Sequence, residues 1–298
     1  MAVFLGFLGV LGFSFSLPAT RVAVEDLDPT FVGVGRAVVA GGLAVALLAA
    51  TSQPRPTRAQ LQPLALVALG VVFGFPLFTA LAMHSLPSAQ GAVIVGVLPA
   101  ATAVAAVLFA GERPSRAFWA ASGAGLLAVL VFAGAQGAGL PSGAHGLVLI
   151  AVALCALGYA KGGALSRELG GWQTICWALV LSLPLTVPIT LVTVLAGDLS
   201  GGADAWAGFA YVSLVSMFLG FFAWYAGLAR GGIARIGQVQ LAQPVLTLLW
   251  AALLLGEDVT PGMVVAALIV LACVVATQRT RVAAPAAVAV PAVPVANR

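Results

Sequence analysis

Long apolar stretches separated by short polar gaps run along almost the whole chain. There are ten of them, each close to the roughly 20 residues that a helix needs to cross about 30 Å of hydrocarbon. The predicted spans are residues 2–22, 31–50, 63–83, 88–110, 116–134, 144–164, 173–195, 206–228, 235–255 and 262–278. The pattern therefore predicts an all-α integral membrane protein with ten transmembrane helices.

The gaps between the spans alternate in charge. Every Lys and Arg except Arg21 and Arg36 lies in or next to an even-numbered gap or at the C-terminus. Seven of the nine acidic residues lie in odd-numbered gaps, the exceptions being Glu112 and Glu168. Because Lys and Arg beside a span are retained on the cytoplasmic side, both termini are predicted to lie inside the cell.

Composition supports the same class. The chain is 62% hydrophobic and only 7% charged, against about 25% charged residues in soluble domains. A multi-pass protein of a bacterial inner (cytoplasmic) membrane is expected, with membrane lipid and a small-molecule substrate as partners. The net charge of +4 comes from loop arginines, so nucleic acid is not an expected partner. The many glycines predict tight helix packing and no particular dimer face, which leaves the oligomeric state open.

An internal repeat occurs at an offset of 145 residues. Pro99 and the pair Gly111-Glu112 match Pro244 and the pair Gly256-Glu257 with identical spacing. Because five spans are an odd number, the second copy must enter the bilayer upside down, as in the inverted repeats of secondary transporters. The expected organisation is one five-helix repeat in residues 1–139 and a second, inverted one in 140–280. The Pro-rich residues 281–298 are expected to form a disordered cytoplasmic tail.

These residues resemble a known family. The stretches VLPAATAVAAVLFAGERPSRAFWAASGAGLLAVLV and AQPVLTLLWAALLLGEDVTPGMVVAALIVLACVV are similar to the two EamA domains of the drug/metabolite transporter superfamily. Pro29-Thr30-Phe31 followed by Arg36 is similar to that domain's proline, aromatic and arginine arrangement. The resemblance covers residues 4–278 and implies alternating-access export of small metabolites, commonly amino acids, with aromatic or other apolar ones favoured. The second copy has no arginine equivalent to Arg36.

Polar groups inside the spans are the candidate substrate ligands. An amide that faces lipid is expensive, and Gln240 and Gln243 lie three residues apart on one helix face, so both are expected to face a water-filled path. Gln243, beside Pro244, is the best single candidate. The other candidate substrate ligands are Ser14, Phe78, Thr79, Tyr159, Trp224 and Tyr225. For Trp224 and Tyr225, membership of an interfacial aromatic belt is an equal alternative.

Two prolines and a histidine are candidate hinge or gate residues. Pro99 and Pro244 lie near the middle of the fourth and ninth spans, where a proline frees a carbonyl and kinks the helix. Each is either a hinge beside the path or a harmless kink. His84, at the outer end of the third span, is a candidate gate or an ordinary interfacial residue.

Three ionisable residues are assigned structural roles. Arg36 is expected to anchor the second span by snorkelling or by pairing with Glu25, Asp26 or Asp28, with binding of a substrate carboxylate as the alternative. Glu112 and Glu257 follow a glycine at the end of a span. The glycine permits a left-handed exit, and the acid is expected to accept hydrogen bonds from the free amides of the next helix.

The sequence argues against catalysis. Only His84 and His145 are present, no G-x-S-x-G or H-E-x-x-H occurs, and no Walker A sequence is found. No cofactor, metal or catalytic residue is therefore expected. An exporter of drugs or nucleobase-like compounds is the alternative within the same class, and a lipid scramblase or intramembrane enzyme is the alternative of another class.

Overall fold

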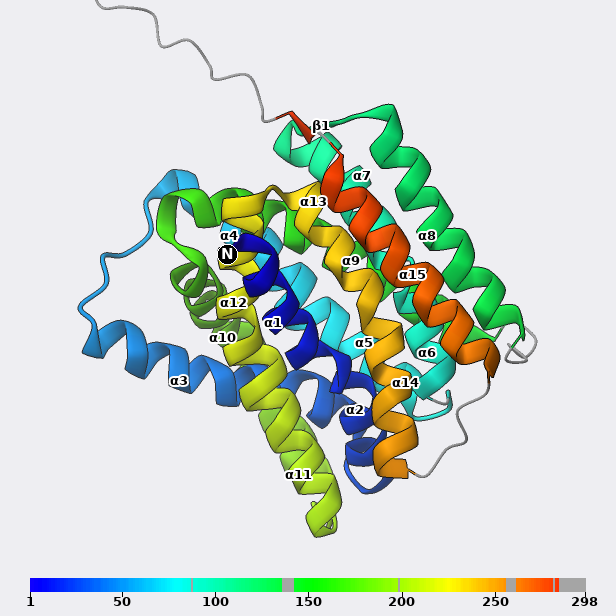
Figure 1. Ribbon diagram of the computed structural model, residues 1–298. Coiled ribbons are helices and arrows are strands. Elements are labelled where there is room, and N and C mark those ends of the chain that lie inside the picture. The colour runs from blue at the N-terminus through cyan, green and yellow to red at the C-terminus, as the bar shows by residue number, and fades with distance from the viewer. Residues whose placement is uncertain (87, 136–141, 198, 256–260, 281, 284–298) are drawn as a thin grey trace, which may run out of the picture.

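The computed structural model of the protein describes residues 1–86, 88–135, 142–197, 199–255, 261–280 and 282–283. These residues form an almost entirely helical bundle (Figure 1). Six helical segments are long and apolar enough to cross a membrane: Ala2–Asp26, Phe31–Ala50, Arg58–Met83, Gly143–Leu169, Gly171–Ala196 and Ala203–Gly231. The chain is therefore an all-α, multi-pass membrane protein, and the count of ten spans with both termini inside stays a prediction.

The other predicted spans are also helical in the residues that the structure describes. They correspond to α6 (Ser88–Val95), α7 (Leu98–Ala110), α8 (Arg116–Ala135), α13 (Ile233–Gly237), a 3₁₀ segment (Gln238–Leu241), α14 (Ala242–Leu255) and α15 (Pro261–Arg279). Helices α9 (Gly143–Leu169) and α10 (Gly171–Ala196) run without interruption.

Several helices are interrupted inside the bundle. The first apolar segment divides at Phe15 into α1 (Ala2–Ser14) and α2 (Ser16–Asp26), with Pro18 in the first turn of α2. Proline has no backbone N–H, so it is tolerated in the first turn of a helix and leaves the carbonyl four residues earlier without its usual donor. The Ser14 carbonyl is the one left free, and the Thr247 hydroxyl of α14 donates to it at 2.7 Å.

Three segments have π-helical geometry, which is typical of functional sites. One, Phe31–Gly35, precedes α3 (Arg36–Ala50), and a second, Ala68–Gly74, joins α4 (Arg58–Val67) to α5 (Phe75–Met83). The third, Val212–Leu219, joins α11 (Ala203–Tyr211) to α12 (Gly220–Gly231).

Helices from the two parts of the chain interdigitate. Helix α1 packs along α12, α3 along α10, α8 along α15, and α9 along both α5 and α7. A Cβ atom on Gly9 would lie 2.9 Å from Trp224 Cβ and 3.1 Å from the Trp224 backbone. Small residues at such crossings allow the helices to approach closely, as expected for a membrane bundle.

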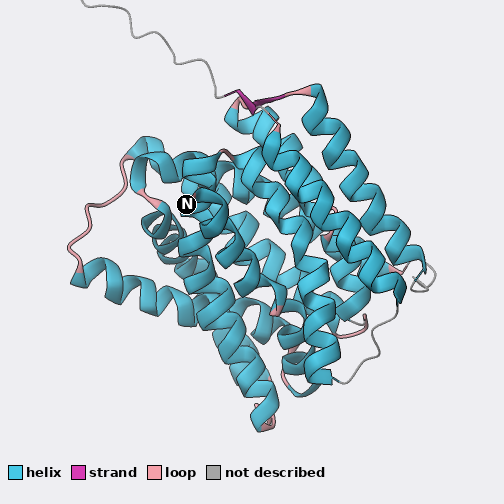
Figure 2. Ribbon diagram, viewed as in Figure 1, coloured by secondary structure: helices cyan, strands magenta, loops and turns pink. Residues whose placement is uncertain are grey.

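A short antiparallel pairing closes one end of the bundle (Figure 2). Strand β1 (Arg113–Pro114) pairs with β2 (Val282–Ala283). The sequence predicts a disordered tail from residue 281, so the ordered pairing at 282–283 differs from that prediction. Residues 281 and 284–298 lie outside the described part of the chain.

Candidate substrate site

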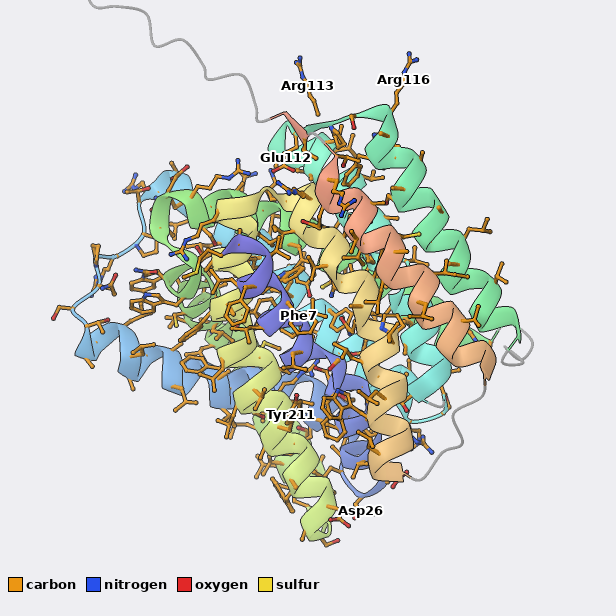
Figure 3. The ribbon with its side chains drawn as sticks, viewed as in Figure 1. Phe7, Asp26, Glu112, Arg113, Arg116 and Tyr211 are labelled. Atoms are coloured by element: carbon orange, nitrogen blue, oxygen red, sulfur yellow. The ribbon has the colours of Figure 1, made fainter. Side chains whose placement is uncertain are left out.

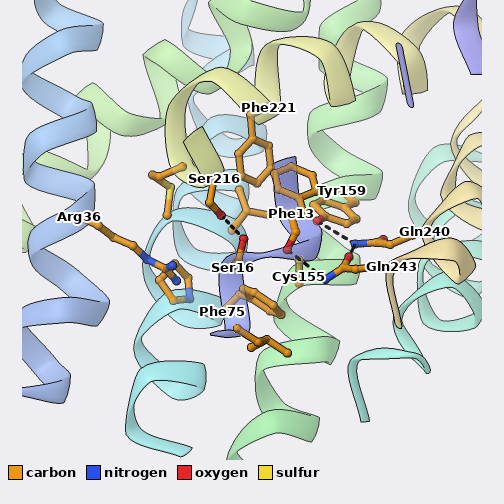
Figure 4. A pocket seen from close by; sticks show the side chains of 14 residues that line it. Phe13, Ser16, Arg36, Phe75, Cys155, Tyr159, Ser216, Phe221, Gln240 and Gln243 are labelled. Atoms are coloured by element: carbon orange, nitrogen blue, oxygen red, sulfur yellow. Dashed lines mark hydrogen bonds between the residues drawn. The ribbon is translucent and has the colours of Figure 1, made fainter. Parts of the chain in front are cut away.

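A cavity lies where the helix interruptions meet (Figure 4). Its empty volume is about 430 Å³. The lining residues come from both halves of the chain: Phe13, Ser16, Leu17, Arg36, Val71, Phe75, Pro76, Cys155, Tyr159, Ser216, Met217, Phe221, Gln240 and Gln243. This mixture of aromatic walls and a few polar groups is typical of small-molecule sites.

Two glutamines and a tyrosine form the polar cluster on one side of the cavity. Gln240 Nε2 donates to Tyr159 Oη at 3.3 Å and to Gln243 Oε1 at 3.1 Å. Gln243 Nε2 donates in turn to the Phe13 carbonyl at 3.5 Å, just before the interruption in the first segment. Gln240 Oε1 is buried and has no hydrogen-bond partner among the described residues.

A second polar contact connects α2 with the π-helical segment Val212–Leu219. Ser16 Oγ donates to Ser216 Oγ at 2.7 Å. In Figure 4 the pair lies between Arg36 on one side and Gln240 on the other. This contact joins helices that are 200 residues apart in the sequence.

Arg36 enters the cavity from the side opposite Gln240 (Figure 4). It is the first residue of α3 and is buried, with 2% of the residue exposed. Its Nε has no hydrogen-bond partner, and no carboxylate within the described residues lies within 4.0 Å of its guanidinium. Among the described residues, the cavity lining contains no Asp or Glu.

The expected pairing of Arg36 with nearby acids is wrong. Glu25 is 3.6 Å from Arg21, Asp26 Oδ2 accepts from the Gly202 amide at 2.9 Å, and Asp28 Oδ1 accepts from the Phe31 amide at 2.8 Å. These carboxylates serve as local ion-pair and capping groups at the ends of the helices. Arg36 is left facing the cavity.

Of the eight candidate substrate ligands, Tyr159, Gln240 and Gln243 line the cavity. Ser14 lies behind it and joins α1 to α14, because its hydroxyl accepts from Trp250 Nε1 at 2.8 Å and donates to the Leu11 carbonyl. Phe78 and Thr79 lie on α5 outside the lining, and the Thr79 hydroxyl donates back to the Phe75 carbonyl.

Trp224 and Tyr225 are packing residues in this conformation. Trp224 is fully buried against Gly6 and Gly9 of α1, and its ring lies 5.1 Å from the Tyr159 ring. The Tyr225 hydroxyl donates to the Gly158 carbonyl at 3.2 Å. Neither residue lines the cavity, and neither forms part of an aromatic belt at the surface, because neighbouring glycines allow both side chains into the interior.

Pro99 and Pro244 do not kink continuous helices. Each lies in the first turn of a new helix, Pro99 in α7 after an interruption at residues 96–97 and Pro244 in α14 after the 3₁₀ segment. The Pro99 carbonyl accepts a hydrogen bond from Gln238 Nε2 at 3.0 Å. His84 is exposed at the end of α5, away from the cavity.

Glu112 connects several helix ends. Gly111 has a φ of 67°, the left-handed exit that the sequence predicts. Glu112 accepts from the Ile233 and Ala234 amides at 2.8 Å each and from Arg167 Nη2 at 2.8 Å. The acid thus caps α13, in the other half of the chain, and not the following helix α8 as expected. Glu257 lies outside the described residues.

The site residues that sequence reasoning missed are neutral. They include Ser216, the aromatic residues Phe13 and Phe221, and Cys155. Ser216 and Phe221 carry no sequence signal, because serines and phenylalanines are frequent in apolar spans. Among the described residues, no group of three or more His, Cys, Asp or Glu side chains lies close enough to hold a metal ion.

Comparison with known families identifies the class of protein. The EamA-like transporter family matches residues 1–134 and again 143–278. The chain belongs to this family. The EamA-like chain is 50% identical over 274 residues to the "Uncharacterized transporter YdeK" of Bacillus subtilis (strain 168), covering 92% of this chain and 96% of YdeK. The EamA-like chain is therefore a transporter and not an enzyme.

Two more distant likenesses complete the comparison. The EamA-like chain is 24% identical over 258 residues to a "Probable terminal-alkyne amino-acid exporter" of Streptantibioticus cattleyicolor, covering 85% of each chain. A crystal structure of a protein with no stated activity has 18% identity and a TM-score of 0.74, covering 93% of this chain and 98% of that one. That likeness shows a shared fold.

Proposed function

We propose that this transporter exports small amphipathic metabolites, amino acids with aromatic or other apolar side chains in particular, across a bacterial inner membrane. The observation that carries the proposal is the cavity, which is lined from both halves of the chain by phenylalanines and by the Gln240, Gln243 and Tyr159 cluster. Aromatic walls suit an apolar side chain, and the polar cluster suits a polar head group. The distant relative whose name includes amino-acid export agrees with this substrate class.

The proposed mechanism is alternating access between two inverted five-helix repeats, with ten spans and both termini inside the cell. Interrupted helices around a central site are characteristic of secondary transporters, because unwound backbone is tolerated where it lines a cavity. The interruptions at Phe15, at residues 96–97 and at Gln238–Leu241 are the places where segments could rotate without breaking long runs of helical hydrogen bonds.

The experiment that tests this function is uptake into proteoliposomes of labelled aromatic, branched and hydroxylated amino acids, with and without an imposed pH gradient. Saturable uptake that depends on the protein, and that falls in Gln243→Ala, is the expected result. Absence of uptake of every amino acid by folded protein would reject the proposal and direct the search to drugs, nucleobase-like compounds or lipids.

A further inference from the structure

We propose that Arg36 binds a carboxylate of the transported molecule and that Gln240 Oε1 binds its ammonium group, so that the cavity selects zwitterions with an apolar side chain. This inference rests on the proposed function and specifies how the same cavity recognises its substrate. Two buried polar groups have no hydrogen-bond partner among the residues that the structure describes: the guanidinium Nε of Arg36 and the amide oxygen of Gln240.

The Arg36 guanidinium is a buried charge at the wall of the cavity. A charge within the membrane is costly unless it is paired or faces water, and intramembrane charges usually mark a substrate or ion pathway. Arg36 is buried at the cavity wall, and the acids that could neutralise it are engaged elsewhere. A guanidinium binds a carboxylate in a planar, bidentate geometry, so an anionic group of the substrate would supply the missing charge.

The amide of Gln240 supplies the second buried group without a partner in the part of the chain that the structure describes. Its amide nitrogen donates to both Tyr159 Oη and Gln243 Oε1. Those two contacts fix the orientation of the amide, and its buried oxygen remains an acceptor without a partner among the described residues. An unpaired acceptor of this kind is costly to bury. The ammonium group of a bound substrate would donate a hydrogen bond to it.

The arrangement of the two groups fits one molecule. Arg36 and Gln240 extend into the cavity from opposite sides, with Phe75 and the Ser16–Ser216 pair between them (Figure 4). Phe13, Phe75 and Phe221 supply the apolar wall. A cationic amine would meet the uncompensated charge of Arg36, so decarboxylated analogues should be rejected although their apolar side chains are identical.

The test is competition against uptake of labelled phenylalanine into proteoliposomes containing the full chain. The competitors are unlabelled phenylalanine, phenylethylamine without the carboxylate, phenylalaninamide with a neutral amide in its place, and 3-phenylpropionate without the ammonium group. In the wild-type protein, phenylethylamine and phenylalaninamide should inhibit at least about tenfold more weakly than phenylalanine, because each leaves the guanidinium unpaired. Equal inhibition by phenylethylamine would overturn the proposal.

Variants connect this discrimination to Arg36. In Arg36→Gln, phenylalanine and phenylalaninamide should compete within about threefold of each other, and Arg36→Lys should keep part of the preference, because lysine retains the charge but not the planar fork. Arg116→Gln is the matched control, since Arg116 points away from the bundle (Figure 3). Full discrimination in Arg36→Gln would overturn the assignment of Arg36.

Cys155 provides a measurement that needs no known substrate. It lines the same cavity, so Cys176→Ala combined with Cys273→Ala leaves one reporter thiol there. A sulfonate-bearing methanethiosulfonate reagent should modify Cys155 at least about tenfold faster than its trimethylammonium counterpart, and Arg36→Gln should abolish that ratio. The same ratio in Arg36→Gln, or no modification by either reagent of folded protein, would overturn the anion site.

The two measurements separate the two proposals. If none of the amino acids tested is transported but the anionic reagent is preferred through Arg36, the anion site is supported and the amino-acid function is rejected. If phenylalanine is transported but neither measurement depends on Arg36, the function stands and this inference fails.

Discussion

Glu112 and Arg36 are two charged residues buried to the same degree, each with 2% exposed, but they differ in their hydrogen-bond and ion-pair partners. Glu112 accepts two backbone amides and one arginine, which satisfies the carboxylate within the protein. Arg36 has no carboxylate among the described residues and faces a cavity. Glu112 is therefore satisfied within the fold, whereas the lack of a described carboxylate beside Arg36 is the basis of the proposal that it binds a group of the substrate.

The largest effect is expected at the satisfied charge. Glu112→Ala leaves the amides of Ile233 and Ala234 uncapped and Arg167 without its partner, at a cost of about 3–5 kcal/mol in the free energy of unfolding. The midpoint of thermal unfolding in detergent measures it. Glu168→Gln is the control, because Glu168 is exposed and has a single long contact with Gln60. Equal midpoints for the two variants would remove the contrast between Glu112 and Arg36.

Arg36→Gln should give the reverse outcome. Transport should fall at least about tenfold, since a hydrogen bond to a charged group is lost, while the midpoint of unfolding stays level or rises, because an uncompensated buried charge is removed. Uptake and thermal unfolding measured on the same preparation check both. A loss of stability comparable to that of Glu112→Ala would mean that Arg36 has a structural partner.

A neutral packing change should affect stability without affecting selectivity. In Gly9→Ala, the new Cβ would meet backbone atoms of Trp224 that no side-chain rotation can move. The expected cost is about 1–3 kcal/mol, with an unchanged ratio of phenylalanine to phenylethylamine inhibition. Gly42→Ala, where no atom lies within 4 Å of the added Cβ, serves as the matched control and should be as stable as the wild type.

Gln243→Ala should have a smaller effect. It removes the hydrogen bonds with Gln240 and with the Phe13 carbonyl, worth about 1 kcal/mol in stability, and it should weaken uptake several-fold by releasing Gln240. Thr247→Val loses the contact with the Ser14 carbonyl, outside the cavity. If Thr247→Val weakened substrate affinity as much as Gln243→Ala, the glutamine would have no special part in binding.

The smallest effect is expected at His84. Its side chain is exposed and away from the cavity, and its carbonyl, which Arg21 contacts at 3.0 Å, is unchanged by substitution. His84→Ala should therefore transport at close to the wild-type rate, with a change in stability below about 0.5 kcal/mol. A large loss of uptake at any pH would place a gate at His84.

The helical membrane class and the family could be predicted from the sequence, because apolar length, flanking charge and the Pro and Gly-Glu repeat are properties of the chain itself. Gln240, Gln243 and Tyr159 could also be found, since an amide in an apolar span has to face something polar. The surroundings of Arg36 could not be predicted from the sequence. Glu25, Asp26 and Asp28 are close to it along the chain, yet each contacts another group.

Contacts between helices that are distant in the sequence could not be predicted either. Gly6, Gly9 and Gly12 predict a close helix contact. Only the fold shows that Gly9 contacts Trp224 and that this tryptophan is buried in the interior, outside the cavity lining. The Ser16–Ser216 contact joins residues 200 positions apart. A single serine in an apolar span carries no sign of such a partner.

The contacts of Glu112 also restrict how the transporter can move. The carboxylate joins the end of α7 to α9 through Arg167 and to α13 through two amides, all at the end of the molecule that carries Arg113 and Arg116 (Figure 3). Helices fastened together at one end can separate most at the other. While these bonds hold, we expect that end to act as the pivot in the proposed alternating access, so that the cavity opens toward the opposite end of the bundle. Opening toward the Arg113 side would require Glu112 to release at least one of its three donors.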